Sequence, residues 1–275
     1  MPELPEVEAV CRKIRPAIAG RRIVSVRLLR PRIALPHSTD EVEAFLFGRR
    51  IETVTRRAKS ILFHLSGRPA AALHIHLRMT GNLEVLPDVR FLPASARFFL
   101  EFSGHVGLVF TDPRALGRIR LLNQDDLSAL DAALGPEPLS RSFTPARLAA
   151  AARASRQPAK LFLLDQKRIA GLGNIYAAEA LFLARIHPAQ PMTTLPPARI
   201  GALHRAIVDT LRRALRSAER EYSRPGTRSE AEDFPLRVYG REGQPCFQCA
   251  RVVHRFKQGG RSTYFCPRCQ RLKGA

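Results

Sequence analysis

The sequence predicts an α+β protein of two domains: an N-terminal antiparallel β-sandwich or barrel preceded by a helix, and a C-terminal helical domain that ends in a four-cysteine finger. Three features predict this class. Short, partly alternating apolar segments fill residues 22–122 and are separated by Gly, Pro, Ser or Asn. Alanine-rich and amphipathic stretches follow residue 140. Four cysteines are clustered in pairs within residues 246–269. A chain of 275 residues has room for two such domains.

The first ten residues predict a helix and also hold a candidate nucleophile. Pro5 suits the first turn of a helix, and Glu6 there complements the helix dipole. Removal of Met1, which a small second residue favours, would leave the ring nitrogen of Pro2 as a free secondary amine. Such an α-amino group titrates near a pKa of ~7.7–8, so part of it is nucleophilic at neutral pH. Glu3 and Glu6 are candidate acid–base groups. Taken alone, these residues favour the purely structural interpretation.

The β-sandwich or barrel is expected from seven short strands and one helical interruption. The helix is expected at residues 38–46, with Ser38 or Thr39 as its N-cap. The strands are expected at residues 23–29, 51–55, 60–65, 72–77, 97–102, 106–110 and 116–121.

The domain boundary is expected in the proline-rich stretch of residues 135–140, which would link a domain of residues 1–134 to a helical domain of residues 141–238. Residues 239–275 would form the finger. Two glycines and an asparagine within residues 169–175 predict a tight turn at a helix N-terminus, which either presents N–H groups to an anion or is a simple connector. Helices are expected at residues 144–153, about 159–166, 175–185 and 196–220, and a surface loop at 223–240.

The charge balance indicates a polyanionic partner. Lys and Arg number 45 against 24 Asp and Glu, which gives a net charge of +21. Nucleic acid fits better than a membrane surface, because no long apolar segment or basic amphipathic helix is evident. The acidic N-terminus does not resemble a signal peptide, so we expect a cytoplasmic, nucleoid-associated protein. Trp is absent, which leaves Phe and Tyr for any stacking on bases.

The cysteine spacing predicts one structural zinc ion. Four cysteines follow the pattern C-x2-C-x16-C-x2-C: Cys246, Cys249, Cys266 and Cys269. The alternative, two disulfides, is disfavoured in a reducing compartment. The fifth cysteine, Cys11, lies on the buried stripe of the first helix and is expected to be a core residue. Residues 241–275 hold eight basic residues and one acidic residue, and Arg261 is expected at a hairpin tip where it contacts phosphate or is simply solvated.

Several motifs occur in a fixed order along the whole chain. They are Met-Pro-Glu-Leu-Pro-Glu at residues 1–6, Arg-Arg-Ala-Lys at 56–59, His-Leu-Arg-Met-Thr-Gly at 76–81, Thr-Asp-Pro-Arg at 111–114, Gly-Leu-Gly-Asn-Ile-Tyr-Ala-Ala-Glu at 171–179, Val-Tyr-Gly-Arg-Glu-Gly at 238–243 and the four-cysteine finger. With these motifs the chain resembles the formamidopyrimidine-DNA glycosylase and endonuclease VIII family. Leu4 and Val7 favour the formamidopyrimidine branch.

The resemblance implies a base-excision enzyme that flips a damaged nucleotide out of double-stranded DNA. It implies a β-sandwich and a helix-two-turn-helix domain with a zinc finger around a basic cleft, in a monomer. Pro2 would attack the anomeric carbon of the sugar as the base leaves, and Glu3 would handle protons at the opening ring. The resulting iminium would permit β- and δ-elimination. The enzyme would therefore be a bifunctional glycosylase and abasic-site lyase.

The resemblance also assigns roles at the DNA. Lys59 would bind phosphate and assist proton transfer, although a strand-edge charge is the alternative. Arg261 and Asn174 would grip the phosphates that flank the lesion, and Lys160 would add a further phosphate contact. The hole left by the everted base would be filled by Met79, Arg114 and Leu116. The family usually has phenylalanine at the position of Leu116. For Met79 the alternative interpretation is a core residue, which is the more common role of a methionine taken on its own.

Two loops depart from the family pattern. Residues 92–97 lack the expected histidine, and residues 217–233 lack the Gly-Gly-Thr/Ser signature of the loop that caps oxidised guanine. We therefore expect activity on abasic sites, formamidopyrimidines and hydantoins before 8-oxoguanine. Two alternatives are a catalytically silent binding protein for damaged DNA on the same scaffold, and a zinc-ribbon regulator that only binds nucleic acid. The second leaves the N-terminal motif unexplained.

Overall fold

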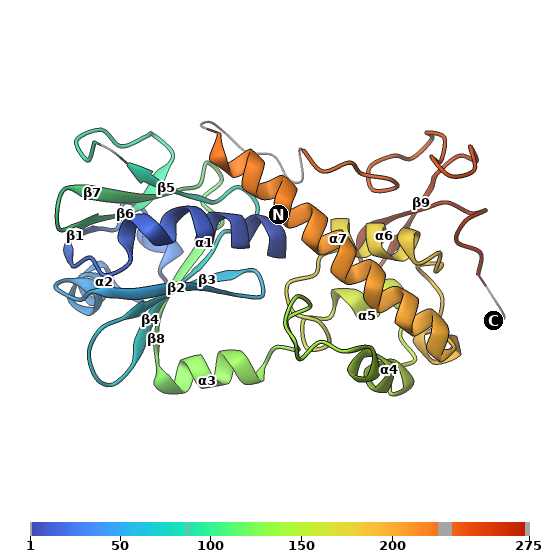
Figure 1. The fold of residues 1–275 in the computed structure, drawn as a ribbon. Helices are drawn as coiled ribbons and strands as arrows, with labels where there is room; N and C mark the ends of the chain where they lie inside the picture. Colours follow the sequence, from blue (N-terminus) through green and yellow to red (C-terminus); the bar gives the residue numbers. More distant parts are fainter. Residues whose placement is uncertain (1, 87, 225–232, 273–275) are drawn as a thin grey trace. The chain divides into compact units, whose positions relative to one another are not determined.

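The computed structural model describes residues 2–86, 88–224 and 233–272, which fall into two compact units. Unit 1 comprises the described residues up to Ala133 together with residues 218–224. Unit 2 comprises Leu134–Ser217 and the described residues from Asp233 onward, so the finger belongs to it. Figure 1 shows the helices and strands of both units.

Unit 1 contains two four-stranded antiparallel sheets with the strand orders β1-β6-β7-β5 and β2-β3-β4-β8. In the first sheet the strands are β1 (Ile23–Arg27), β5 (Asn82–Leu86), β6 (Ala96–Phe102) and β7 (Val106–Thr111); in the second they are β2 (Ile51–Arg57), β3 (Ser60–Leu65), β4 (Ala71–His76) and β8 (Arg118–Asn123). The predicted antiparallel β architecture of this part of the chain is confirmed.

The strand register explains how unit 1 builds its core. Ile61, Ile75 and Ile119 lie opposite one another on β3, β4 and β8, and all three are buried. Because side chains alternate along a strand, the neighbouring residues Leu62 and His74 point to the other face of the sheet. Helix α1 (Leu4–Ile18) adds a stripe of buried residues at helical spacing to the same core: Val7, Val10, Cys11, Ile14 and Ile18.

One strand and one α-helix of unit 1 were not predicted. Strand β5 has only five residues, Asn-Leu-Glu-Val-Leu, and its short alternation follows Gly81 directly. Helix α3 (Gln124–Ala132) begins with a capping box in which Asn123 accepts from the backbone of Asp126 and Asp126 accepts from that of Asn123. The predicted strand at residues 116–121 begins later, at Arg118, because residues 112–117 form a turn. Helix α2 (Thr39–Leu46) is capped by Ser38.

Unit 2 is helical, with α4 (Pro145–Arg153), α5 (Ala159–Leu164), α6 (Asn174–Leu183) and the part of α7 (Pro197–Ser223) that precedes Ala218. Helix α7 is longer than predicted, so residues 217–223 are helical and do not belong to the loop expected at 217–233. Alanine, arginine and glutamate in these turns are good helix formers, and Ala218 and Tyr222 are buried in the core of unit 1. Residues 225–232 of the expected loop lie outside the described residues.

The remaining elements are short. Two 3₁₀ turns, η1 (Pro31–Ile33) and η2 (Met192–Thr194), precede helices, and strands β9 (His254–Gln258) and β10 (Arg261–Phe265) form an antiparallel hairpin in unit 2. The hairpin turns at Gly259 and Gly260, which both have positive φ. Across the described residues, the structure contains no helix with the length and apolar character needed to cross a membrane.

Candidate active site and zinc centre

The N-terminal residues form a buried helix start. Pro2 is buried, and Glu3 and Glu6 are 3% and 2% exposed. The backbone N–H of Glu3 donates to Glu6 Oε2 over 2.8 Å, and Glu3 accepts in turn from the backbone of Glu6. This reciprocal capping box satisfies N–H groups that the first turn of α1 leaves without helical partners. The carboxylate of Glu6 therefore holds the residue that follows Pro2.

Lys59 lies in the tight turn between β2 and β3 and is 7% exposed. Its neighbour Ala58 has a φ of 53°, and the Ala58 carbonyl accepts from Arg56 Nη1 over 2.9 Å. Arg56 Nε also pairs with Glu8 Oε2 at 3.0 Å, and Glu8 lies on α1. Burial alone would raise the pKa of Glu8, but hydrogen bonds and charge from Arg12 and Arg56 hold it below its usual value. The Arg56–Glu8 pair thus joins the Lys59 turn to the helix that follows Pro2.

Sequence reasoning gave no role to His76, although it opens one of the motifs. It lies opposite Ser60 in the β3–β4 register, and Ser60 directly follows Lys59 in the sequence. Burial, followed by the charges of Arg78 and Lys59, lowers its pKa to about 4. Its Nδ1 accepts from the backbone N–H of Arg78 over 3.0 Å, which leaves the proton of the neutral ring on Nε2. His76 therefore offers an N–H donor beside Lys59.

The three residues expected to fill the DNA duplex lie on two neighbouring connections between the sheets of unit 1. Met79 follows β4, and Arg114 and Leu116 follow β7. Met79 and Leu116 are 43% and 38% exposed, whereas core side chains of their type are buried. Arg114 is also exposed. The interpretation of Met79 as a core residue does not hold.

In unit 2 the glycine-rich turn precedes α6 as expected. Gly171 has a φ of 81°, and its N–H donates to Gln166 Oε1 over 2.8 Å, while Gln166 Nε2 donates to the Leu172 carbonyl. Helix α6 starts at Asn174, whose Nδ2 donates to the Ser262 carbonyl over 3.2 Å. Among the described residues, the buried Oδ1 of Asn174 has no hydrogen-bond partner. This polar atom is one that a ligand donor could satisfy.

Lys160 is placed differently from the expected phosphate contact. It is 0% exposed, and its Nζ donates to the Ser262 carbonyl over 2.7 Å and to Thr263 Oγ1 over 2.6 Å. Burial, and then the charge of Arg261, lower its pKa to about 8. Lys160 therefore fixes β10 to α5, because its ammonium group is engaged inside the unit. Arg261 is exposed at the start of β10, directly beside the residues that Lys160 holds.

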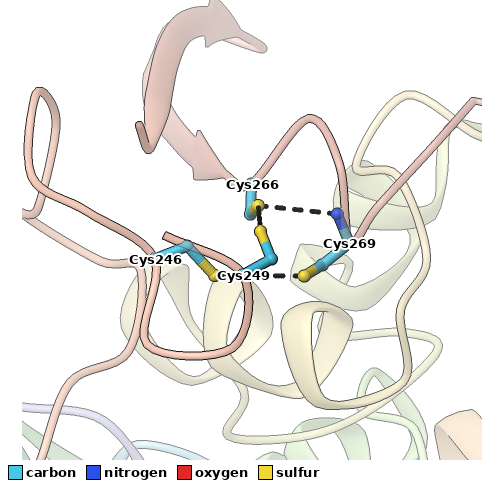
Figure 2. Close-up of side chains that lie close together, drawn as sticks. All are labelled: Cys246, Cys249, Cys266 and Cys269. Carbon is cyan, nitrogen blue, oxygen red and sulfur yellow. Dashed lines mark hydrogen bonds between the residues drawn. The ribbon is translucent and has the colours of Figure 1, made fainter. Parts of the chain in front are cut away.

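Cys246 and Cys249 precede β9, and Cys266 and Cys269 follow β10. The side chains of the four cysteines point toward one another (Figure 2). Their sulfur atoms all lie within 4.8 Å of one another. The sulfurs of Cys246 and Cys269 are 3.9 Å apart, and those of Cys249 and Cys266 are 3.4 Å apart. Zinc–sulfur bonds of about 2.3 Å in a tetrahedron place sulfurs about 3.8 Å apart. A disulfide requires about 2.05 Å, so the four cysteines are free thiols whose arrangement suits zinc.

Further contacts prepare the sulfurs for a cation. Backbone N–H groups donate to two of them, from Gln248 to Cys246 Sγ over 3.4 Å and from Cys269 to Cys266 Sγ over 3.5 Å. Burial opposes ionisation of Cys249, but hydrogen bonds from the backbone of Arg251 and the other thiols lower its pKa to about 7. Cys11, by contrast, packs in the core of unit 1, where burial raises its pKa to about 12, as its position on the helical stripe predicts.

Two buried polar residues that the sequence did not identify tie the finger to the helices of unit 2. Glu179 accepts from the backbone N–H groups of Arg237, Val238 and Tyr239, each over 2.9 Å. Gln270 accepts from the N–H of Cys266 over 2.9 Å and donates to the Ile186 carbonyl over 2.8 Å. Glu179 ends the Gly-Asn-Ile-Tyr motif, so a signal was present, but its backbone partners are about 60 residues away and follow only from the fold.

Known families match the chain in three successive segments. The formamidopyrimidine-DNA glycosylase N-terminal domain matches residues 1–119, the formamidopyrimidine-DNA glycosylase H2TH domain matches residues 134–224, and a zinc finger found in FPG and IleRS matches residues 243–272. The formamidopyrimidine-DNA glycosylase of Chloroflexus aurantiacus is 45% identical over 278 residues, which are 98% of each chain. That of Streptococcus pneumoniae strain R6 is 38% identical and covers 98% of this chain.

Solved structures agree with the sequence relatives. A mutant of the Lactococcus lactis enzyme in complex with Fapy-dG containing DNA is similar with a TM-score of 0.87 at 32% identity, covering 98% of this chain and 100% of that chain. The L. lactis enzyme non-covalently bound to DNA with an abasic site gives a TM-score of 0.85 at 30% identity, with the same coverage. The fold, the cysteine centre and these matches define a DNA glycosylase of base excision repair with a zinc finger. The chain belongs to the formamidopyrimidine-DNA glycosylase family.

Proposed function

We propose that the chain is a bifunctional DNA glycosylase and abasic-site lyase whose nucleophile is the amine of Pro2 after removal of Met1. The observation that carries this proposal is the ion pair between Glu8 and Arg56, because it ties the helix after Pro2 to the turn that presents Lys59. A nucleophile and a cation must be held in fixed geometry to act together on one sugar. Burial of Pro2 and Glu3 supports the same proposal, since a desolvated amine is more readily unprotonated.

The proposed reaction has three steps. The nitrogen of Pro2 attacks C1′ of the deoxyribose, the glycosidic bond breaks, and the base leaves with the bonding electron pair and takes up a proton. The sugar ring then opens as Glu3 protonates its oxygen and the amine loses its proton, which gives an iminium between the nitrogen and C1′. The iminium acidifies the C2′ proton, so successive β- and δ-eliminations release the phosphates on either side. Lys59 binds phosphate and assists these proton transfers.

The DNA contacts are assigned to residues of both units. In unit 1, Met79, Arg114 and Leu116 occupy the space left by the everted base, and His76 offers an N–H donor beside Lys59. In unit 2, Arg261 and Asn174 contact phosphates, and Lys160 positions Arg261 without touching DNA. The surplus of basic residues supports this phosphate-dominated binding. The enzyme acts as a monomer with one structural zinc ion, held by the four cysteines of the finger.

The proposed substrates are abasic sites, formamidopyrimidines and hydantoins, with 8-oxoguanine cleaved more slowly. Support comes from the sequence of residues 217–233, which lacks the Gly-Gly-Thr/Ser signature and is helical as far as Ser223. A longer helix leaves fewer residues for a loop that caps a base.

The test is a panel of duplexes that carry an abasic site, a formamidopyrimidine, a hydantoin or 8-oxoguanine, each cleaved under single-turnover conditions. We expect products with phosphate at both ends of the gap and the slowest cleavage for 8-oxoguanine. Tight binding of the abasic duplex without cleavage would instead support a silent damaged-DNA binding protein and would overturn the enzyme proposal.

A further inference from the structure

A buried carboxylate connects the β4–β5 connection, which carries Met79, to the β7–β8 connection, which carries Arg114 and Leu116. Asp112 directly follows β7 and is 0% exposed. Its Oδ1 accepts from the hydroxyl of Thr80, and Thr80 is the neighbour of Met79 on the β4–β5 connection. A buried carboxylate is stable only where hydrogen bonds replace the lost water, so its partners are held in place.

The same carboxylate fixes the β7–β8 connection at two points. Asp112 Oδ1 accepts from the N–H of Arg114 over 3.3 Å, and Oδ2 accepts from the N–H of Gly117 over 2.7 Å. These two donors bracket Leu116, and the backbone between them passes through Ala115 with a φ of 49°. Loss of the bond from Gly117 would remove the donor to the buried Oδ2, whereas Oδ1 accepts from Thr80 and from Arg114 and so links the two connections.

Close packing leaves both loops little freedom to rearrange. A Cβ at Gly117 would lie 2.4 Å from Cζ of Phe110, and a Cβ at Gly81 would lie 2.4 Å from the carbonyl oxygen of Leu77. The N–H of Gly81 donates to that same carbonyl over 3.0 Å, which closes the turn that holds Met79. The bond between Thr80 and Asp112 is therefore a tether between two stiff loops.

We infer that Asp112, with Thr80 as its partner, is the positioning residue that sets Met79 relative to Arg114 and Leu116 when the three side chains enter a duplex. The inference rests on the proposed duplex-filling roles of those side chains. Three side chains on two loops can fill the space left by one everted base only if the two loops keep a fixed separation. Loss of the hydrogen bond between Thr80 and Asp112 should therefore slow cleavage of double-stranded DNA and leave the chemistry at Pro2 intact.

The test compares abasic sites in duplex and in single-stranded DNA, because a single strand has no hole to fill. The variant Thr80→Val removes the hydroxyl that donates to Asp112 at an exposed position, so the fold is retained. We expect it to slow cleavage of the duplex by about tenfold while the single-strand rate stays within about twofold. Thr80→Ser, which keeps the hydroxyl, should restore the duplex rate, and Thr53→Val, the same change at an exposed position on β2, should have no effect.

A second readout uses the base opposite the lesion. In Thr80→Val and in Asp112→Asn, the spread of single-turnover rates over the four opposite bases should shrink by about the same tenfold factor, because Arg114 no longer meets the orphaned base in one geometry. Wild-type ratios of duplex to single-strand rate in Thr80→Val would overturn the inference, as would an equal loss on both substrates. If wild-type protein cleaved neither substrate, the proposed function would fail first, and the two failures are thereby distinguished.

Discussion

The carboxylate of Glu6 accepts a hydrogen bond from the backbone N–H of Glu3 over 2.8 Å, one turn inside the start of α1. This contact places a side chain that sequence reasoning treated as an acid–base candidate in the role of a helix cap. Since Glu3 directly follows Pro2, the cap determines the direction in which the chain leaves the helix toward Pro2.

The cap can be separated from acid–base chemistry by two variants of Glu6. Glu6→Gln keeps an oxygen that accepts from the N–H of Glu3, so its cleavage rate should stay within about twofold of wild type. Glu6→Ala removes the acceptor and should lower the single-turnover rate on an abasic duplex by about tenfold, because the N-terminus is misplaced. Equal losses in the two variants would show instead that the carboxylate of Glu6 exchanges a proton.

The buried ammonium of Lys160 is predicted to act on DNA through Arg261. Lys160→Met removes its two hydrogen bonds to β10 and should weaken binding of an abasic duplex by about tenfold. Combining it with Arg261→Gln should add little to the loss of the single Arg261 variant, since both act on the same contact. Lys257→Met, at an exposed lysine of the same hairpin, controls for the change in charge. Additive losses for Lys160 and Arg261 would show two independent phosphate contacts.

Zinc removal is predicted to unfold the finger. Elemental analysis of the folded protein should give one zinc per chain, and Cys249→Ser should lose most of it, whereas Cys11→Ala should keep it. After chelation, amides of β9 and β10 should lose their protection from hydrogen exchange while those of β3 and β4 keep theirs. Protection of the hairpin without zinc would mean that the contacts of Lys160 and Gln270 suffice to hold it.

One buried histidine, His74, and one half-buried histidine, His76, predict a loss of stability in acid. Burial, and then neighbouring charges, lower the pKa values of His74 and His76 to about 4. The unfolded histidines titrate near a pKa of ~6.5, so the unfolded chain binds more protons than the folded chain between about pH 6.5 and 4. The stabilisation is therefore complete above that window and falls as the pH drops through it, by up to about 2.7 kcal/mol per pH unit for two protons.

Hydrogen exchange of β3 and β4 between pH 7 and 4 measures this dependence. His74→Gln should reduce the slope by about 1.4 kcal/mol per pH unit, because one of the two protons no longer binds. A slope that is the same in the wild type and His74→Gln would contradict the account of these two groups.

The features that sequence reasoning placed well are local. The helix at residues 4–18 follows from its proline, its acidic first turn and its apolar stripe, and the finger follows from cysteine spacing. Strand β5 was missed because its pairing with β7 is not visible in the local sequence, and the end of α7 beyond residue 220 was missed because Tyr222 is anchored in the core of unit 1 by residues distant in sequence. The roles of Lys160, Glu179 and Asp112 depend on partners that only the fold brings near.

The central claim is that the N-terminal amine of Pro2 forms the covalent intermediate, and its attachment site can be measured directly. The processed protein is incubated with an abasic duplex, reduced with borohydride and digested, and the peptide that carries the DNA is located by mass spectrometry. We predict that the adduct lies on Pro2 and that Pro2→Gly, which replaces the secondary amine, loses most of it. An adduct on a lysine such as Lys59, or its full yield in Pro2→Gly, would contradict the account.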